Sequence, residues 1–176
     1  IIRRMTEGIY NEEEYQKALA WAKEKCIIGF DKNPDSVRKS DEEKDAQFEF
    51  VVKMAVIIKD LMNGNPNLPA GCEEEMVGHN AIAAGFQGQR QWTDYKPNFD
   101  FPESMMCTSF DWNGPREAKI LATENDFLNG MSMLFGHLLT NKGAMFSDIR
   151  TYWSPEAVER VSGKRPEGGA ANGFIH

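Results

Sequence analysis

The spacing of apolar positions predicts a helix near the N-terminus. Its apolar residues recur three and four positions apart, which is typical of a helix with one buried face. These residues are Tyr15, Ala18, Leu19 and Ala22. Asn11 stands before three glutamates in the form of a capping box, so we expect the helix to begin at Glu12 and to run to about Cys26.

A second and longer helix is predicted over Asp41–Met62. Ser40 and Glu43 have the spacing of a capping box, and Asn63-Gly64-Asn65-Pro66 supplies a glycine stop with a proline beyond it. The apolar pattern predicts one inner face made of Phe48, Val51, Val52, Ala55, Ile58 and Leu61.

From Asn80 onwards the pattern changes to short apolar runs. Residues 81–85 predict a short buried strand that leads into a loop over 86–90 and a brief helix through Trp92. Asp100, together with Glu103, is expected to cap a short helix through Ser109.

A strand–helix–strand unit is predicted next. Residues 119–123 and 144–149 read as strands, and residues 126–139 between them read as a helix. Such a unit returns parallel and right-handed, so we expect the two strands to lie side by side. Ser154-Pro155 predicts the start of a final helix, and the glycine-rich residues 163–172 predict a loop.

Helices that alternate with short apolar strands predict an α/β fold. We expect a mostly parallel sheet flanked by helices, in a Rossmann-like layer architecture. The chain opens on Ile1 without an initiator methionine and ends on an apolar stretch, so we expect a piece of a longer protein, with the fold truncated at both ends.

Composition excludes several classes of partner. The formal net charge is −7 with no basic stripe, which argues against nucleic acid. No apolar run approaches the roughly 20 residues that a membrane span needs. Cys26, Cys72 and Cys107 are widely spaced and form no CxxC pair, so we expect reduced thiols in a cytoplasmic protein rather than a zinc knuckle or a disulfide framework.

Glu124 and Asp148 are the first candidates for chemistry, because each lies at the end of a predicted strand. Adjacent strands are about 5 Å apart, so two such carboxylates can share one divalent cation. Ligands that are only oxygens favour Mg²⁺ or Mn²⁺ over zinc. The alternative is that each acid caps a helix or pairs with a base, and the spacing leaves both interpretations open.

Gln87 is the candidate for binding a ligand. Its loop, Gly85-Phe86-Gln87-Gly88-Gln89-Arg90, lacks both nucleotide-binding glycine patterns. An amide that donates and accepts hydrogen bonds suits sugar hydroxyls, although a simple tight turn explains the loop equally well.

Aromatic and histidine residues are weaker candidates. Tryptophans 92, 112 and 153 could line a carbohydrate pocket, but partly buried anchors are the commoner role. We expect His79 and His137 to be hydrogen-bonded residues rather than metal ligands.

Four long stretches resemble the L-fucose isomerase family: NAIAAGFQGQRQWTD, TSFDWNG, ATENDFLNG and FSDIRTYWSPEAVERVSG. The resemblance covers essentially the whole chain. Members of that family are much longer at both ends. The resemblance therefore implies that residues 1–139 are most of a central α/β domain and that residues 140–176 begin the C-terminal domain.

The resemblance also implies a function. Members are ketol isomerases that convert L-fucose to L-fuculose, and D-arabinose to D-ribulose, through an enediol with Mn²⁺. By the matching motifs, Glu124 and Asp148 are the metal ligands and proton-transfer residues, and Gln87 contacts the substrate. The third metal ligand of the family is a histidine outside this chain, and the family assembles as a hexamer.

Two positions depart from the family pattern, and two alternatives stay open. Gln91 replaces a histidine before Trp92, and Phe99 replaces a glycine in a turn. If the chain by itself does not carry the activity, it is either a catalytically inactive domain or a sugar-binding module without chemistry. With two of three protein ligands, we expect it to bind Mn²⁺ loosely.

Overall fold

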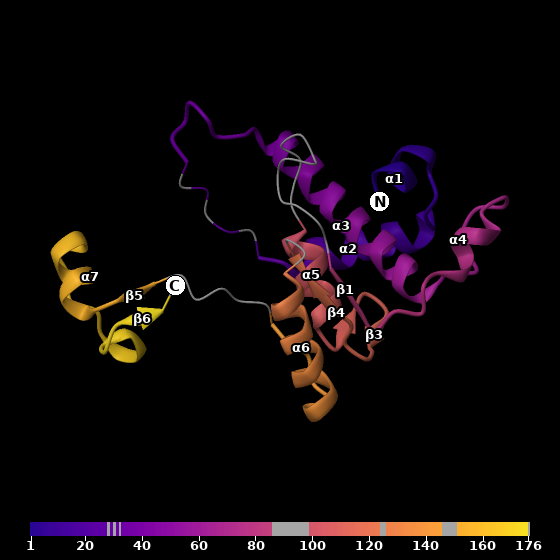
Figure 1. Cartoon of the computed structure of the whole chain (residues 1–176). Helices are drawn as coiled ribbons and strands as arrows, with labels where there is room; N and C mark the ends of the chain where they lie inside the picture. The colour runs from indigo at the N-terminus through magenta and orange to yellow at the C-terminus, as the bar shows by residue number, and fades with distance from the viewer. Residues whose placement is uncertain are drawn as a thin grey trace. The chain divides into compact units, whose positions relative to one another are not determined.

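The computed structural model describes residues 1–27, 29, 31, 33–85, 99–123, 126–145 and 151–175. The chain divides into two compact units, Ile1–Met145 and Phe146–His176, and each is described by itself (Figure 1).

The first unit contains six described helices and four described strands. The helices are α1 (Ile2–Glu7), α2 (Glu12–Lys25), α3 (Asp41–Asn63), α4 (Glu73–Val77), α5 (Asp100–Cys107) and α6 (Phe127–Thr140). The strands are β1 (Ala83–Gly85), β2 (Phe110–Asp111), β3 (Gly114–Pro115) and β4 (Ile120–Ala122).

Helix α2 confirms the first prediction. The Asn11 side chain accepts a hydrogen bond from the Glu14 amide at 2.8 Å, and all four predicted apolar residues are buried. Only half of the expected capping box forms, because the Glu14 carboxylate turns away from Asn11 and accepts hydrogen bonds from α3 and from the β2–β3 turn.

Helix α3 confirms its predicted bounds and its capping box. The Ser40 hydroxyl accepts from the Glu43 amide at 3.2 Å, and the Glu43 carboxylate accepts from the Ser40 amide at 2.8 Å. The prediction of a single inner face is wrong for the second half of the helix, where Val56 and Ile57 are as fully buried as Val52. The reason is that α3 packs against α2 and also against α5.

The strands β1 and β4 form a parallel pair in which Ala84 lies opposite Leu121. This pair, with helices packed on it, supports the α/β class in its coarse form. Strands β2 and β3 form a small antiparallel hairpin, with Phe110 opposite Pro115. No more than two strands pair in any one sheet within the described residues.

Helices α5 and α6 stand on either side of β4 in sequence. Helix α5 begins at Asp100, with Phe99 rather than Asp100 as its N-cap residue, so the predicted cap is wrong. Helix α6 matches the prediction within one residue, and Asp126 caps it by accepting from the Asn129 amide at 3.1 Å. The predicted strand 144–149 falls mostly on residues 146–150, outside the described residues.

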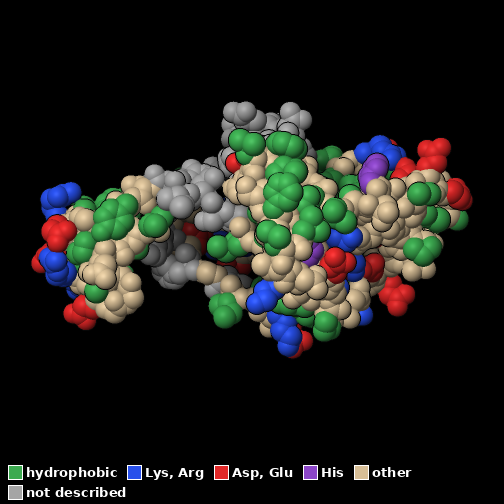
Figure 2. Space-filling view, turned by 60° about the horizontal axis from the view of Figure 1, so that its bottom comes forward, with side chains coloured by type: hydrophobic (Ala, Val, Ile, Leu, Met, Phe, Trp, Pro, Cys, Tyr) green, Lys and Arg blue, Asp and Glu red, His purple; other side chains and the backbone are tan. Residues whose placement is uncertain are grey.

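One surface of the first unit is apolar. Most of α6 is exposed, because only Met133 and His137 among its residues are buried. Hydrophobic side chains are visible on the surface of the molecule (Figure 2), and those of α6 include Phe127, Leu128, Phe135, Leu138 and Leu139.

The second unit is small. Strands β5 (Tyr152–Trp153) and β6 (Phe174–Ile175) pair antiparallel, and α7 (Pro155–Ser162) lies between them in sequence. The Ser154 hydroxyl accepts from the Ala157 amide at 3.2 Å, with Pro155 in the first turn, as predicted. The predicted loop 163–172 contains one short 3-10 turn, Gly168–Ala170.

Across the described helices, none combines the length and the apolar character that crossing a membrane requires.

Candidate functional site

The three residues that the sequence singles out, Gln87, Glu124 and Asp148, lie outside the described residues. The structure does describe the elements from which the first two emerge. These elements define the framework of the candidate site.

Strands β1 and β4 end at the same edge of the sheet. They are parallel, and their last residues, Gly85 and Ala122, lie opposite each other. In the sequence, Gln87 follows Gly85 by two residues, and Glu124 follows Ala122 by two residues. The carboxyl edge of a parallel sheet is where open α/β folds bind their ligands.

The two edges of β4 are both occupied. On one edge, the Ile120 amide donates to the Ile82 carbonyl at 3.0 Å, next to β1. On the other edge, the alternate amides of residues 119, 121 and 123 face α5. They donate to the Met106 carbonyl at 2.8 Å, to the Cys107 Sγ at 3.5 Å and to the Glu103 Oε2 at 2.8 Å, in that order. Most of the predicted strand 144–149 lies outside the described residues, so its expected pairing with β4 stays a prediction.

After α6 the chain returns to the level at which β4 begins. An added Cβ on Gly143 would lie 2.5 Å from the Cys107 carbonyl oxygen, so the backbone passes close to the C-terminal end of α5. That end of α5 is next to the first residues of β4, because the Lys119 amide donates to the Met106 carbonyl. A strand, a helix and a return to the start of the strand are what a parallel crossover requires. Asp148 follows Gly143 by five residues.

The residues on both sides of Glu124 and Asn125 are anchored. The Thr123 amide donates to Glu103, and the Thr123 carbonyl accepts from the Asp126 amide at 3.2 Å. Asp126 in turn caps α6. The two residues between Thr123 and Asp126 therefore join two fixed points.

A shallow pocket of about 240 Å³ borders this framework. Its lining comes from β1, β4 and the first turns of α6, and includes Gly85, Ala122 and Asp126. Helix α6 packs closely on β4 at Gly130, where an added Cβ would lie 3.1 Å from the Ala122 Cβ. This close packing limits the depth of the pocket. The lining is mostly apolar, with one carboxylate at the helix start.

Two of the weaker candidates, Trp112 and His137, take the structural roles that the sequence favoured. Trp112 is buried, and its Nε1 donates to the Glu14 Oε1 at 3.0 Å. The His137 Nδ1 lies 2.7 Å from the Lys142 carbonyl oxygen, so this buried ring is a hydrogen-bonded residue as predicted. Trp92 lies outside the described residues.

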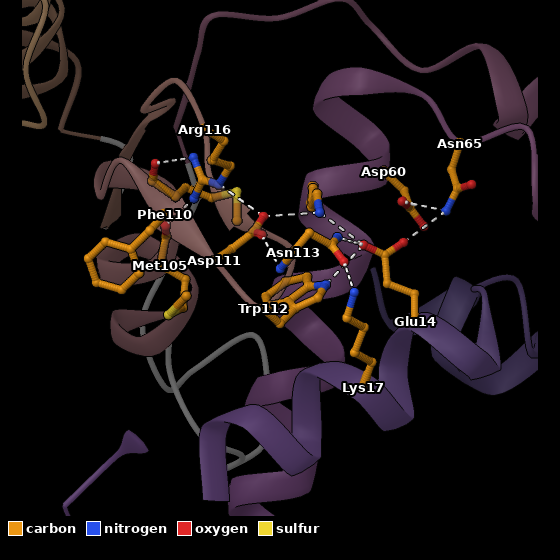
Figure 3. Close-up of polar contacts among 12 residues, drawn as sticks. Glu14, Lys17, Asp60, Asn65, Met105, Phe110, Asp111, Trp112, Asn113 and Arg116 are labelled. Atoms are coloured by element: carbon orange, nitrogen blue, oxygen red, sulfur yellow. Dashed lines mark hydrogen bonds and ion pairs between the residues drawn. The ribbon is translucent and has the colours of Figure 1, made fainter. Parts of the chain in front are cut away.

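Sequence reasoning missed a buried polar network around Glu14 (Figure 3). We define the central polar network as Glu14, Lys59, Asp111, Trp112, Asn113 and Arg116. The Lys59 Nζ lies 2.9 Å from the Glu14 Oε1 and 3.0 Å from the Asp111 Oδ2, which also pairs with the Arg116 Nε at 3.0 Å. The one hint of this network in the sequence is that Glu14 is the last of three consecutive glutamates.

The network controls the charge of Glu14. Burial by itself raises the pKa of this carboxyl group, but Lys59 and the N–H donors of Trp112 and Asn113 outweigh burial and hold the pKa below its ordinary value. The network links α2, α3 and the β2–β3 hairpin and satisfies its members internally. We therefore interpret it as structural. In the ranges that the structure covers, no three of the His, Cys, Asp and Glu side chains come together in a way that could hold a metal ion.

Comparisons with known proteins agree on one family. Residues 1–141 match the model of the second N-terminal domain of L-fucose isomerase. The chain is 64% identical over its full length to a protein of Bacteroides thetaiotaomicron named L-fucose isomerase, and 60% identical over 99% of its length to one of Streptococcus pneumoniae strain P1031 with the same name. The chain spans about 30% of the length of each of these relatives.

Proposed function

Because the chain belongs to the L-fucose isomerase family, we propose that it carries the metal-binding part of an aldose–ketose isomerase. The substrate proposed is L-fucose, which would be converted to L-fuculose, with D-arabinose to D-ribulose as a second reaction. High identity over the full chain supports the reaction class. The shared carboxyl edge of β1 and β4 supports the location.

The donor set proposed for the metal is the pair of carboxylates Glu124 and Asp148, with a histidine from outside the chain as the third ligand. Carboxylate oxygens suit Mn²⁺, and Glu124 follows the end of β4 at the edge where such ligands gather. When bound, Mn²⁺ would supply Lewis-acid polarisation of the sugar oxygens.

The residues of the chain would move the protons and hold the sugar. One of the two carboxylates removes the proton from C2 of the aldose, and the other carboxylate or a water molecule returns a proton to C1 of the enediol. The Gln87 amide binds sugar hydroxyls, because it donates and accepts.

The rest of the proposal concerns the protein as a whole. We infer that the β1–β4 pair is part of a larger, mostly parallel sheet of Rossmann-like layout, and that the assembly is a hexamer. The three cysteines are free, which suits the reducing conditions of a cytoplasm.

The test uses a chimera in which this chain replaces the matching 30% of the B. thetaiotaomicron protein. With Mn²⁺ and L-fucose, Glu124→Gln and Asp148→Asn should each lower kcat by roughly 10²–10⁴-fold, the contribution of a general acid or base. Gln87→Leu should raise KM for the sugar with a smaller change in kcat. Glu42→Gln, an exposed carboxylate in the first turn of α3, is the matched control and should leave both constants unchanged.

Full activity of the Glu124→Gln chimera would refute the proposed site. The isolated chain should show no turnover, because it supplies two of the three protein ligands. If the isolated chain binds L-fucose equally well in EDTA and after Glu124→Gln, a sugar-binding role without chemistry replaces the isomerase proposal.

A further inference from the structure

Glu103 occupies an unusual place beside the candidate site. It is in the first half of α5, and its Oε2 accepts a hydrogen bond from the amide of Thr123, the residue immediately before Glu124. Thr123 is itself buried. A side-chain carboxylate thus holds the backbone amide that directly follows β4 and directly precedes the proposed metal ligand.

This carboxylate is partly buried. Among the described residues no ion pair includes Glu103, and burial raises its pKa more than the hydrogen bonds from Thr123 lower it. Keeping a half-buried acid without a basic partner costs free energy, and the hydrogen bond from the Thr123 amide offsets part of this cost.

Docking of α5 onto β4 does not depend on Glu103. The other end of the helix is fixed by the hydrogen bond from the Lys119 amide to the Met106 carbonyl and by contacts from the Arg116 guanidinium to the Met105 and Met106 carbonyls. Buried Pro102, Met105 and Met106 add apolar packing. Glu103 is the contact of α5 that reaches the carboxyl end of β4.

We propose that Glu103 is a positioning residue, which holds the Thr123 backbone and so sets the direction in which Glu124 leaves β4. The proposal rests on the proposed function of Glu124. The opposite side of the same junction is already fixed, since the Thr123 carbonyl accepts from the Asp126 amide. Glu103 therefore completes a clamp on the residue that precedes a proposed catalytic group. A shift of about 1 Å in such a group is enough to lower a rate by roughly 10²-fold.

The experiment compares three substitutions in the full-length chimera. Glu103→Gln keeps an acceptor oxygen at the same reach, Glu103→Asp withdraws the acceptor by one methylene group, and Glu103→Leu removes it. We expect kcat with L-fucose to stay within about threefold for Gln and to fall roughly 10–100-fold for Asp and Leu, with KM changed by less than about threefold. Ser104→Ala, an exposed neighbour on α5, is the control.

The outcomes separate positioning from packing. Rescue by Gln together with a loss in kcat but not in KM supports the proposal. Unchanged kcat for Asp, with or without a lower melting temperature, overturns it, and the Gln–Asp contrast decides even if the Leu variant does not fold. If Glu124→Gln in the same chimera retains activity, the proposed function has failed; if Glu124→Gln is inactive while Glu103→Asp is fully active, only the role of Glu103 has failed.

Discussion

The two halves of the first unit bury their surfaces in opposite ways. The half built from α2, α3 and the β2–β3 hairpin encloses even some charged groups, and Asp111 is a fully enclosed carboxylate held by Lys59 and Arg116. The half built from β1, β4 and α6 leaves large apolar side chains in solvent, such as Leu139 at 86% exposure.

This difference shows where the unit is complete. Helix α3 has protein on all sides of its second half, so its core does not require further chain. The exposed apolar row on α6 is typical of a surface that packs against more protein. The candidate catalytic edge belongs to this open half, which agrees with a site that needs ligands from elsewhere. We therefore predict that the isolated chain self-associates through this surface.

The largest effect is expected in the closed half. Glu14→Ala leaves Lys59 with one fewer partner and removes the acceptor for the Trp112 and Asn113 N–H groups. Because Lys59 keeps Asp111 as a partner, the lost hydrogen bonds to a charged group should cost about 2–3 kcal/mol of unfolding free energy. Urea unfolding of the chain, followed by tryptophan fluorescence, measures this loss.

Glu12→Ala is the matched control for that experiment. It changes a glutamate in the same first turn of α2, where the side chain is exposed and accepts only from Gln16. Its cost should stay below about 0.5 kcal/mol, as for other surface substitutions. Equal losses for the two variants would show that the central polar network contributes little to the closed half.

Asp60 gives the closed half a measurable pH dependence. Burial raises the pKa of this carboxyl group from 3.8 to about 6, with Glu14 adding to the shift and Asn65, Arg4 and Lys59 opposing it. Its Oδ1 accepts from the Asn65 Nδ2 at 2.9 Å, while its Oδ2 has no hydrogen-bond partner among the described residues. The pKa of Asp60 is higher in the folded chain than in the unfolded chain, so protonation of Asp60 favours folding. This contribution to the free energy of unfolding is fully present below pH 3.8 and is lost as the pH rises through about 6.

Asp60→Asn tests that dependence. The amide keeps an acceptor for Asn65 but cannot ionise, so the unmodified chain should lose about 2 kcal/mol relative to the variant between pH 4 and pH 7. Urea midpoints at unit steps of pH measure the difference. A constant difference between the Asp60 variant and the unmodified chain across this range would contradict the raised pKa.

Local signals predicted the elements of both halves, because they act within a few residues. The Ser40–Glu43 capping box, the Asn11 cap and the Asp126–Thr140 helix all follow from short-range rules of spacing and capping. The parallel pairing of β1 with β4 depends on contacts between residues far apart in sequence, as does the network around Glu14. No local pattern encodes such contacts, so Lys59 and Arg116 were not anticipated.

The candidate site shows the same division. Its proposed chemistry was inferred from residue types and from the family resemblance. The covering of one edge of β4 by α5 was not predicted, because it depends on Met106, Cys107 and Glu103 contacting alternate amides of a strand distant in sequence. The predicted pairing of strand 144–149 with β4 stays a prediction, because most of that strand lies outside the described residues. The predictions for Gln87, Glu124 and Asp148 stay predictions.

The smallest effects are expected in the open half, from substitutions of two glycines. Gly143 lies next to the end of α5, and Gly136 lies in the middle of α6. Gly143→Ala places a methyl group 2.5 Å from the Cys107 carbonyl oxygen, so the backbone must shift, at a cost of about 1–3 kcal/mol. Gly136→Ala, in the middle of α6, meets no atom within 4 Å and should stabilise the chain by about 0.5–1 kcal/mol, because alanine loses less conformational freedom in a helix. Urea unfolding of both variants gives the two signs. If Gly143→Ala leaves the free energy of unfolding unchanged, the chain after α6 packs loosely against α5. The open half would then be loosely packed beside α5 as well as exposed on the α6 surface.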